Sequence, residues 1–266
     1  MSLELIPAVH EILDKVKTLT GKEVRFVEKK DHPSFASIKV ARKSMEAHLL
    51  LYKPERSGLI NHLVAHECGH VLRMYAVPVE KRLIPRSDSV VKKRGLIRIQ
   101  GEIDKLSSVL PIDKLDRIVN MWYDGLVSQV INQPPDIMIE KWLYIDYPAL
   151  RHYQQQSIQN QRREALAGLS DRVAQVTPPT IVDASNIMNY AFFKLLGETF
   201  GVNYVGPYRQ TPYIARGGNL AKVTQDCPDY DGDVENIKNW AEFLGISGWF
   251  EWAGFEDVPE NYDKIA

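Results

Sequence analysis

The segment VAHECGHVL, residues 64–72, restricts the fold and the chemistry of this 266-residue chain more than any other stretch. It places His66, Glu67 and His70 within five positions of a run that is otherwise apolar or small. The surrounding apolar residues would cover most of a helix circumference: Leu59, Ile60, Leu63, Val64, Val71 and Leu72. A buried polar side chain without a partner costs on the order of 1–3 kcal/mol. A metal ion would give all three polar groups a shared partner.

The spacing of the three polar residues fits a metal site on a helix. Positions i and i+4 of a helix lie about 40° apart, so His66 and His70 can direct both imidazoles at one point. Glu67 lies about 100° from His66, beside that face. This is the pattern H-E-x-x-H, in which the histidines bind zinc and the glutamate is a general base. The alternative is two buried histidines satisfied by hydrogen bonds, with Glu67 in a salt bridge and no metal.

Composition and charge exclude several classes of protein. Apolar residues make up 44% and charged residues 25% of the chain, and the net charge of −1 does not indicate a nucleic-acid binder. Neither a secretory signal nor an apolar stretch long enough to span a membrane is found in the sequence. Two cysteines, Cys68 and Cys227, do not make a disulfide framework. We therefore expect a cytoplasmic protein without nucleic-acid or membrane partners. The sequence does not indicate its oligomeric state.

Apolar periodicity and turn residues predict that the chain opens with a helix and three strands. The helix is expected over residues 3–19, and the strands over 23–29, 35–43 and 46–53. The helix that carries the motif would follow and end before Pro78.

The remainder is predicted to be mainly helical. The segment NQPP at 132–135 is expected to end a helix, and residues 202–233 are expected to be mostly loop. The other predicted helices cover residues 87–110, 111–131, 136–145, 149–175, 184–201 and 233–246. We therefore predict an α+β fold with a small N-terminal sheet. Its core would span residues 1–150, and a mainly helical C-terminal lobe over 151–266 would pack on that core.

The motif HECGH, on an apolar helix that follows a strand such as HLLLYK, resembles the zincin metallopeptidases over residues 48–72. The resemblance implies a zincin-type active-site helix, with zinc bound by His66 and His70 and with Glu67 as general base. It implies a hydrolase that cleaves a peptide bond in a peptide or protein substrate. It also implies that the strand over 46–53 forms the edge of the cleft and pairs with an extended substrate.

Zincin subgroups differ in their third zinc ligand. The metzincin pattern is absent because the next histidine after His70 is His152, and the peptide deformylase pattern fails because no cysteine precedes Cys68. The segment PPDIMIEKWL resembles the gluzincin pattern, which implies Glu140 as the third ligand. Asp136, one turn earlier, would then orient one of the histidines or cap a helix.

The order of these two acids leaves a second assignment open. Gluzincins place the supporting aspartate after the glutamate ligand, whereas here Asp136 precedes Glu140. The two roles can therefore be exchanged, with Asp136 as the ligand and Glu140 as the support, since both residue types bind zinc. His152 is a further candidate ligand or stabiliser of the reaction intermediate, although a lone histidine in ALRHYQQQ is more often exposed.

The sequence is also compatible with two other functions. One is a regulatory protein that binds zinc but has little or no general protease activity, as in intracellular zincins of the ImmA/IrrE type. The other is a structural helical protein without metal. The sequence does not indicate the substrate, the position of cleavage within it, the group that stabilises the oxyanion, or any means of regulation.

Overall fold

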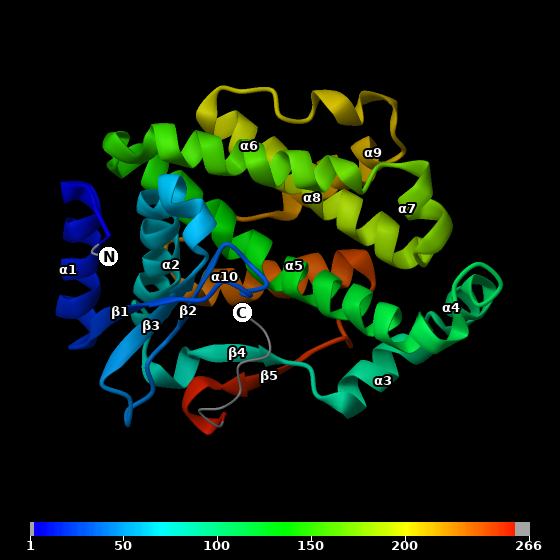
Figure 1. Cartoon of the computed structure of the whole chain (residues 1–266), viewed down its shortest axis with the longest axis horizontal. Coiled ribbons are helices and arrows are strands. Elements are labelled where there is room, and N and C mark those ends of the chain that lie inside the picture. Colours follow the sequence, from blue (N-terminus) through cyan, green and yellow to red (C-terminus); the bar gives the residue numbers. More distant parts are fainter. Residues whose placement is uncertain (1–2, 259–266) are drawn as a thin grey trace.

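The chain begins with a helix and a small sheet and continues mainly as helices, as the computed structural model shows (Figure 1). The structure describes residues 3–258, except for the side chains of residues 55–57 and 112. The first elements are α1 (Pro7–Thr20), β1 (Glu23–Glu28), β2 (Ala36–Lys39), β3 (Ala47–Tyr52), the 3-10 helix η1 (Pro54–Leu59) and α2 (Ile60–Tyr75). These bounds confirm the predicted opening order of one helix, three strands and the motif helix.

The elements after α2 are mostly helical, which confirms the α+β class. They are η2 (Val79–Lys81), β4 (Leu83–Arg86), α3 (Ser89–Ile97), α4 (Gln100–Leu106), α5 (Ile112–Asp146), η3 (Pro148–Leu150), α6 (Arg151–Ala167), α7 (Asp171–Val176), α8 (Pro179–Phe200), η4 (Gly206–Gln210), α9 (Tyr213–Val223), α10 (Tyr230–Leu244), β5 (Glu251–Gly254) and η5 (Phe255–Asp257). None of the helices in the described part combines the length and the apolar character of a membrane span.

The strand β3 is the central strand of the N-terminal sheet. The strand order is β1-β3-β2, with β3 parallel to β1 and antiparallel to β2. The prediction that residues 46–53 form an edge strand is therefore wrong. The strand β3 is a nearly continuous apolar run in which Leu50 is fully buried, as suits a strand with neighbours on both sides. In the described sheet the edges are β1 and β2.

The helix α5 runs without interruption through Pro134 and Pro135, so the predicted break at 132–135 is wrong. The two prolines remove backbone donors and cost about 3 kcal/mol each in a helix interior. Buried apolar residues on both sides of them offset this cost, at about 1.5–3 kcal/mol for each large side chain. They are Val130, Ile131, Ile137, Met138, Ile139 and Leu143. One continuous helix therefore carries both Asp136 and Glu140.

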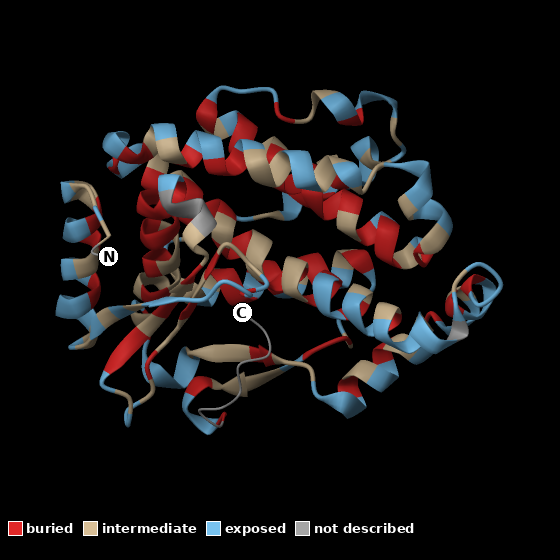
Figure 2. Ribbon diagram, viewed as in Figure 1, coloured by how far each residue is buried: buried red, intermediate tan, exposed pale blue. Residues whose placement is uncertain are grey.

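Over the residues that the structure describes, the apolar core has two clusters, and α5 belongs to both. One cluster joins α1, the sheet and α2 to the C-terminal part of α5. The other joins the preceding part of α5 to α8, α9 and α10. Figure 2 shows the buried residues along α2 and α5. The strand β5 also returns to pair with β4, so residues 251–254 lie beside residues 83–86. The buried core therefore does not divide at residue 150.

Three of the helical predictions were wrong in detail. The single helix expected over 87–110 is the pair α3 and α4, and the one expected over 149–175 is the pair α6 and α7. The loop expected over 202–233 contains α9. The sequence of α9 includes Gly217 and Gly218, which are poor helix formers. A Cβ atom on Gly217 would lie 2.6 Å from Cδ1 of Tyr190 in α8. The glycine is therefore needed for the close packing of α9 on α8.

Candidate metal centre

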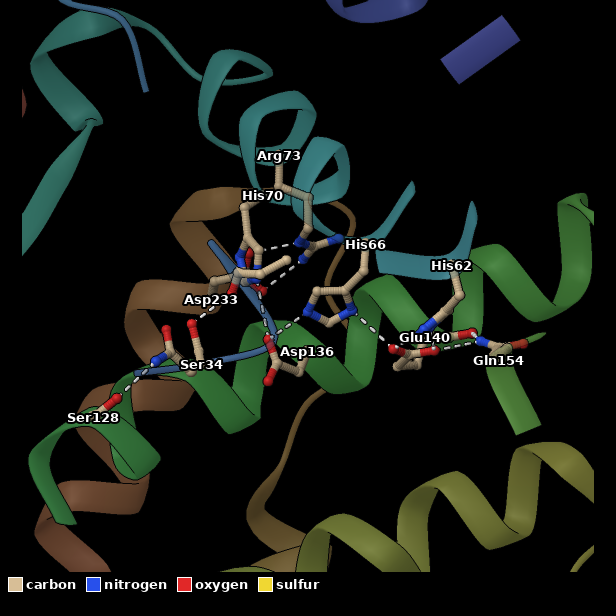
Figure 3. A network of polar contacts seen from close by, with 12 residues as sticks. Ser34, His62, His66, His70, Arg73, Ser128, Asp136, Glu140, Gln154 and Asp233 are labelled. Carbon is tan, nitrogen blue, oxygen red and sulfur yellow. Dashed lines mark hydrogen bonds and ion pairs between the residues drawn. The ribbon is translucent and has the colours of Figure 1, made fainter. Parts of the chain in front are cut away.

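Two facing helices supply the candidate ligands. The helix α2 carries His62, His66 and His70, one turn apart on one face, and α5 carries Asp136 and Glu140 opposite them (Figure 3). The motif itself contains the residue that allows this approach. A Cβ atom on Gly69 would lie 2.6 Å from Cγ2 of Ile139 in α5. Because Gly69 has no side chain, α2 and α5 can pack closely enough to bring the histidines and the carboxylates together.

The first group of ligand atoms lies at the accessible side of this contact. Oδ1 of Asp136 is 3.3 Å from Nε2 of His66 and 3.2 Å from Nε2 of His70. The three side chains are 16%, 12% and 25% exposed, respectively. Ligand atoms held tetrahedrally around zinc at 2.0–2.1 Å lie about 3.3 Å apart, so these separations suit a shared zinc ion. Oδ1 of Asp136 is buried, and both contacts to it are longer than the usual length, about 2.7–2.9 Å, of a charge-assisted hydrogen bond, so a cation between the three atoms would suit this position.

The second group surrounds Glu140 and is almost completely buried. Nδ1 of His66 donates to Oε1 of Glu140 at 2.8 Å, and Nε2 of His62 lies 2.9 Å and 3.1 Å from the two carboxylate oxygens. Nε2 of Gln154, from α6, donates to Oε2 of the same carboxylate and to the Glu140 backbone oxygen. The side chains of His62 and Glu140 are 2% and 1% exposed. Hydrogen bonds from three side chains therefore account for this carboxylate without a metal ion.

Charges within the two groups stabilise each other. Burial alone lowers the pKa of His66, but the charge of Asp136 and the hydrogen bonds to Asp136 and Glu140 outweigh it, so its pKa is raised. Burial raises the pKa of both carboxyl groups, and the neighbouring histidines outweigh that effect too. His66 and His70 lower the pKa of Asp136, and His62 and His66 lower that of Glu140. Both acids are therefore ionised at neutral pH, as a metal ligand or a hydrogen-bond acceptor must be.

A buried ion pair fixes the end of α2 just after His70. Nε and Nη2 of Arg73 donate to the two carboxylate oxygens of Asp233, in α10, at 2.6 Å and 2.7 Å. The Asp233 side chain is fully buried. Nη2 also donates to the backbone oxygens of Cys227 and Asp229. This bidentate ion pair holds the last turns of α2, which include His70, against α10.

The other candidates from the sequence lie in different settings. Glu67 is half-buried and makes no hydrogen bond or ion pair with the described residues. It comes from the turn between His66 and His70. Cys68 is fully buried in the apolar cluster around α2, and burial raises the pKa of its thiol, as expected of a packing residue. His152 is exposed on α6, contacts Gln156 and belongs to neither group of candidate ligands.

A separate surface cleft of about 630 Å³ lies beside α6. Its lining includes His152, Gln155, Gln159 and Tyr204, but none of the residues in the two groups around Asp136 and Glu140. The cleft is therefore distinct from the metal centre.

Four residues at or beside the site were not predicted from the sequence: His62, Gln154, Arg73 and Asp233. Only His62 had a usable signal, because it precedes His66 by one helical turn and so continues the histidine face. Gln154 and Asp233 reach this region only when α6 and α10 pack around α2, and Arg73, on α2 itself, meets its partner Asp233 only then.

Comparison with known proteins adds no family assignment. No family model matches the chain, and no curated protein or solved structure is significantly similar to it.

Proposed function

We propose that the chain is a zinc-dependent peptidase of the zincin type, with His66, His70 and Asp136 as the metal ligands. One observation supports this more than any other. Nε2 of both histidines lies within 3.3 Å of the same oxygen of Asp136, at a partly exposed position between α2 and α5. A catalytic zinc site needs three such protein ligands and a position that remains accessible.

The contacts favour the exchanged roles of the two acids. Glu140 was favoured as the third ligand from the sequence, but it is fully buried and accepts hydrogen bonds from His62, His66 and Gln154. Oδ1 of Asp136 faces both Nε2 atoms, at 3.3 Å and 3.2 Å, and both contacts are longer than a charge-assisted hydrogen bond. Glu140 would then hold Nδ1 of His66, in the way that carboxylates orient metal-binding histidines.

The residues of the chain have distinct roles in this proposal. A zinc ion bound here would act as a Lewis acid, polarising the scissile carbonyl and activating water for attack. Glu67 takes the proton of the attacking water and passes it to the leaving amine. By helix geometry its side chain lies about 100° from His66 and about 60° from His70, beside the ligand face. Its carboxylate is available because no described residue binds it.

An extended substrate would bind along β2. This strand is an edge of the described sheet and packs against α2, whereas β3 has neighbours on both sides. Backbone hydrogen bonds to an edge strand hold a peptide with little dependence on its side chains.

Cleavage of a peptide mixture tests the proposed activity. The zinc-loaded protein is expected to generate new peptide termini, detected by mass spectrometry. Cleavage should stop when a chelator removes the zinc and resume when zinc is restored, because the bound ion supplies the Lewis acid. Cleavage that continues after verified zinc removal would contradict the proposal. A zinc-loaded protein that cleaves nothing in the mixture would favour the regulatory zinc-binding alternative.

A further inference from the structure

We propose that His62 is a positioning residue of the metal centre: it holds Glu140, which in turn holds the ligand His66. This inference rests on the proposed zinc site and adds a member to it that the H-E-x-x-H motif does not contain. His62 lies one turn before His66 on α2, and its imidazole is turned toward Glu140 in α5 (Figure 3).

The contacts of Glu140 define the proton positions around it. An ionised carboxylate only accepts hydrogen bonds, so each of its neighbours must present a hydrogen. His62 donates from Nε2, His66 donates from Nδ1, and Gln154 donates from its amide. Nδ1 of His62 has no hydrogen-bond partner among the described residues, so its contacts give no reason to move the proton there.

The same proton positions prepare His66 for a metal ion. A metal ion that binds His66 displaces the hydrogen on Nε2, and the hydrogen bond to Glu140 keeps the remaining hydrogen on Nδ1. The lone pair of His66 is then on Nε2, the atom that lies 3.3 Å from Oδ1 of Asp136. Groups that hold a ligand in this way change metal affinity without touching the metal.

The position of Glu140 depends on His62 in particular. Nε2 of His62 spans both carboxylate oxygens, at 2.9 Å and 3.1 Å, whereas the side chains of His66 and Gln154 each bind one of them. Without His62, the Glu140 carboxylate loses the donor that contacts both of its oxygens. The hydrogen bond to His66 is then less well oriented.

Zinc affinity measured on two substitutions of His62 tests this role. His62→Phe removes the donor and keeps a ring, and its zinc dissociation constant is expected to rise about 10- to 100-fold. His62→Gln places an amide N–H near the position of Nε2 and should recover most of the affinity. The constants are measured by competition with a chromophoric chelator. The unfolding midpoint of each metal-free protein is measured alongside.

The control is His48, a second fully buried histidine, which lies in β3 outside both groups of candidate ligands. His48→Phe should lower the unfolding midpoint but leave the zinc dissociation constant unchanged. If His62→Phe behaves in the same way, its role is merely structural and the inference is wrong. If the wild-type chain itself binds no zinc, the proposed function fails, which is a different outcome.

Proton positions in the wild-type protein provide a second test, should His62→Phe fail to fold. A long-range ¹H–¹⁵N spectrum of the histidine side chains is expected to show hydrogen on Nε2 of His62 and on Nδ1 of His66. A His62 that lacks hydrogen on Nε2 would overturn the inference, since it would have nothing to donate to Glu140.

Discussion

Replacing Glu67 with glutamine is expected to leave zinc bound and to reduce peptide hydrolysis by about 10²- to 10⁴-fold. The amide has nearly the size of the carboxylate but cannot take a proton from water. Glu67 makes no hydrogen bond or ion pair with the described residues, so the substitution should leave the fold unchanged. The measurements are kcat on a peptide that the wild-type protein cleaves and the zinc content of the same sample.

A matched substitution separates this effect from a general loss of negative charge. Glu80 is exposed in η2, outside the candidate ligand groups, and Glu80→Gln should keep full activity. Unchanged cleavage by Glu67→Gln would remove Glu67 from the mechanism, even if zinc is required.

Substitutions of Asp136 and Glu140 are expected to have opposite principal effects. Asp136→Ala should lose stoichiometric zinc while the metal-free protein stays folded, because it removes one partly exposed ligand. Glu140→Ala should lower the free energy of unfolding by about 3–5 kcal/mol, because it leaves buried donors from His62, His66 and Gln154 without their acceptor. Denaturant unfolding of the metal-free proteins measures the second effect.

The milder substitution Glu140→Gln then distinguishes ligand from support. It keeps an acceptor oxygen of the same reach, so we expect one zinc per chain, held about 10- to 100-fold more weakly. The reverse order, with Glu140→Gln free of metal and Asp136→Ala still binding zinc, would make Glu140 the third ligand.

The sequence predicted the local parts of the site well. The strands before α2 and the bounds of α2 itself follow from alternation and helical periodicity, which depend on neighbouring residues only. The pairing of His66 with His70 follows from the same helix geometry. These features need no knowledge of how distant segments pack.

The errors concern interactions between distant segments. The pattern of apolar and polar residues over 46–53 predicts a strand, but it cannot show that β3 lies between two other strands. Strand order depends on tertiary structure. Pro134 and Pro135 predict a break that the packing of α5 overrides. The roles of Asp136 and Glu140 stayed open because both lie on one face of α5. Only the position of α5 relative to α2 shows which acid faces Nε2 of His66.

The zinc content of the purified protein, measured by elemental analysis without added metal, shows whether α2 and α5 form a metal centre. We expect about one zinc per chain, held by His66, His70 and Asp136. A protein that contains no metal and takes up none when zinc is added would rule out the proposed zinc site. The histidines of α2 would then be buried side chains held by hydrogen bonds to Asp136 and Glu140, and the proposal of a peptidase would have to be abandoned.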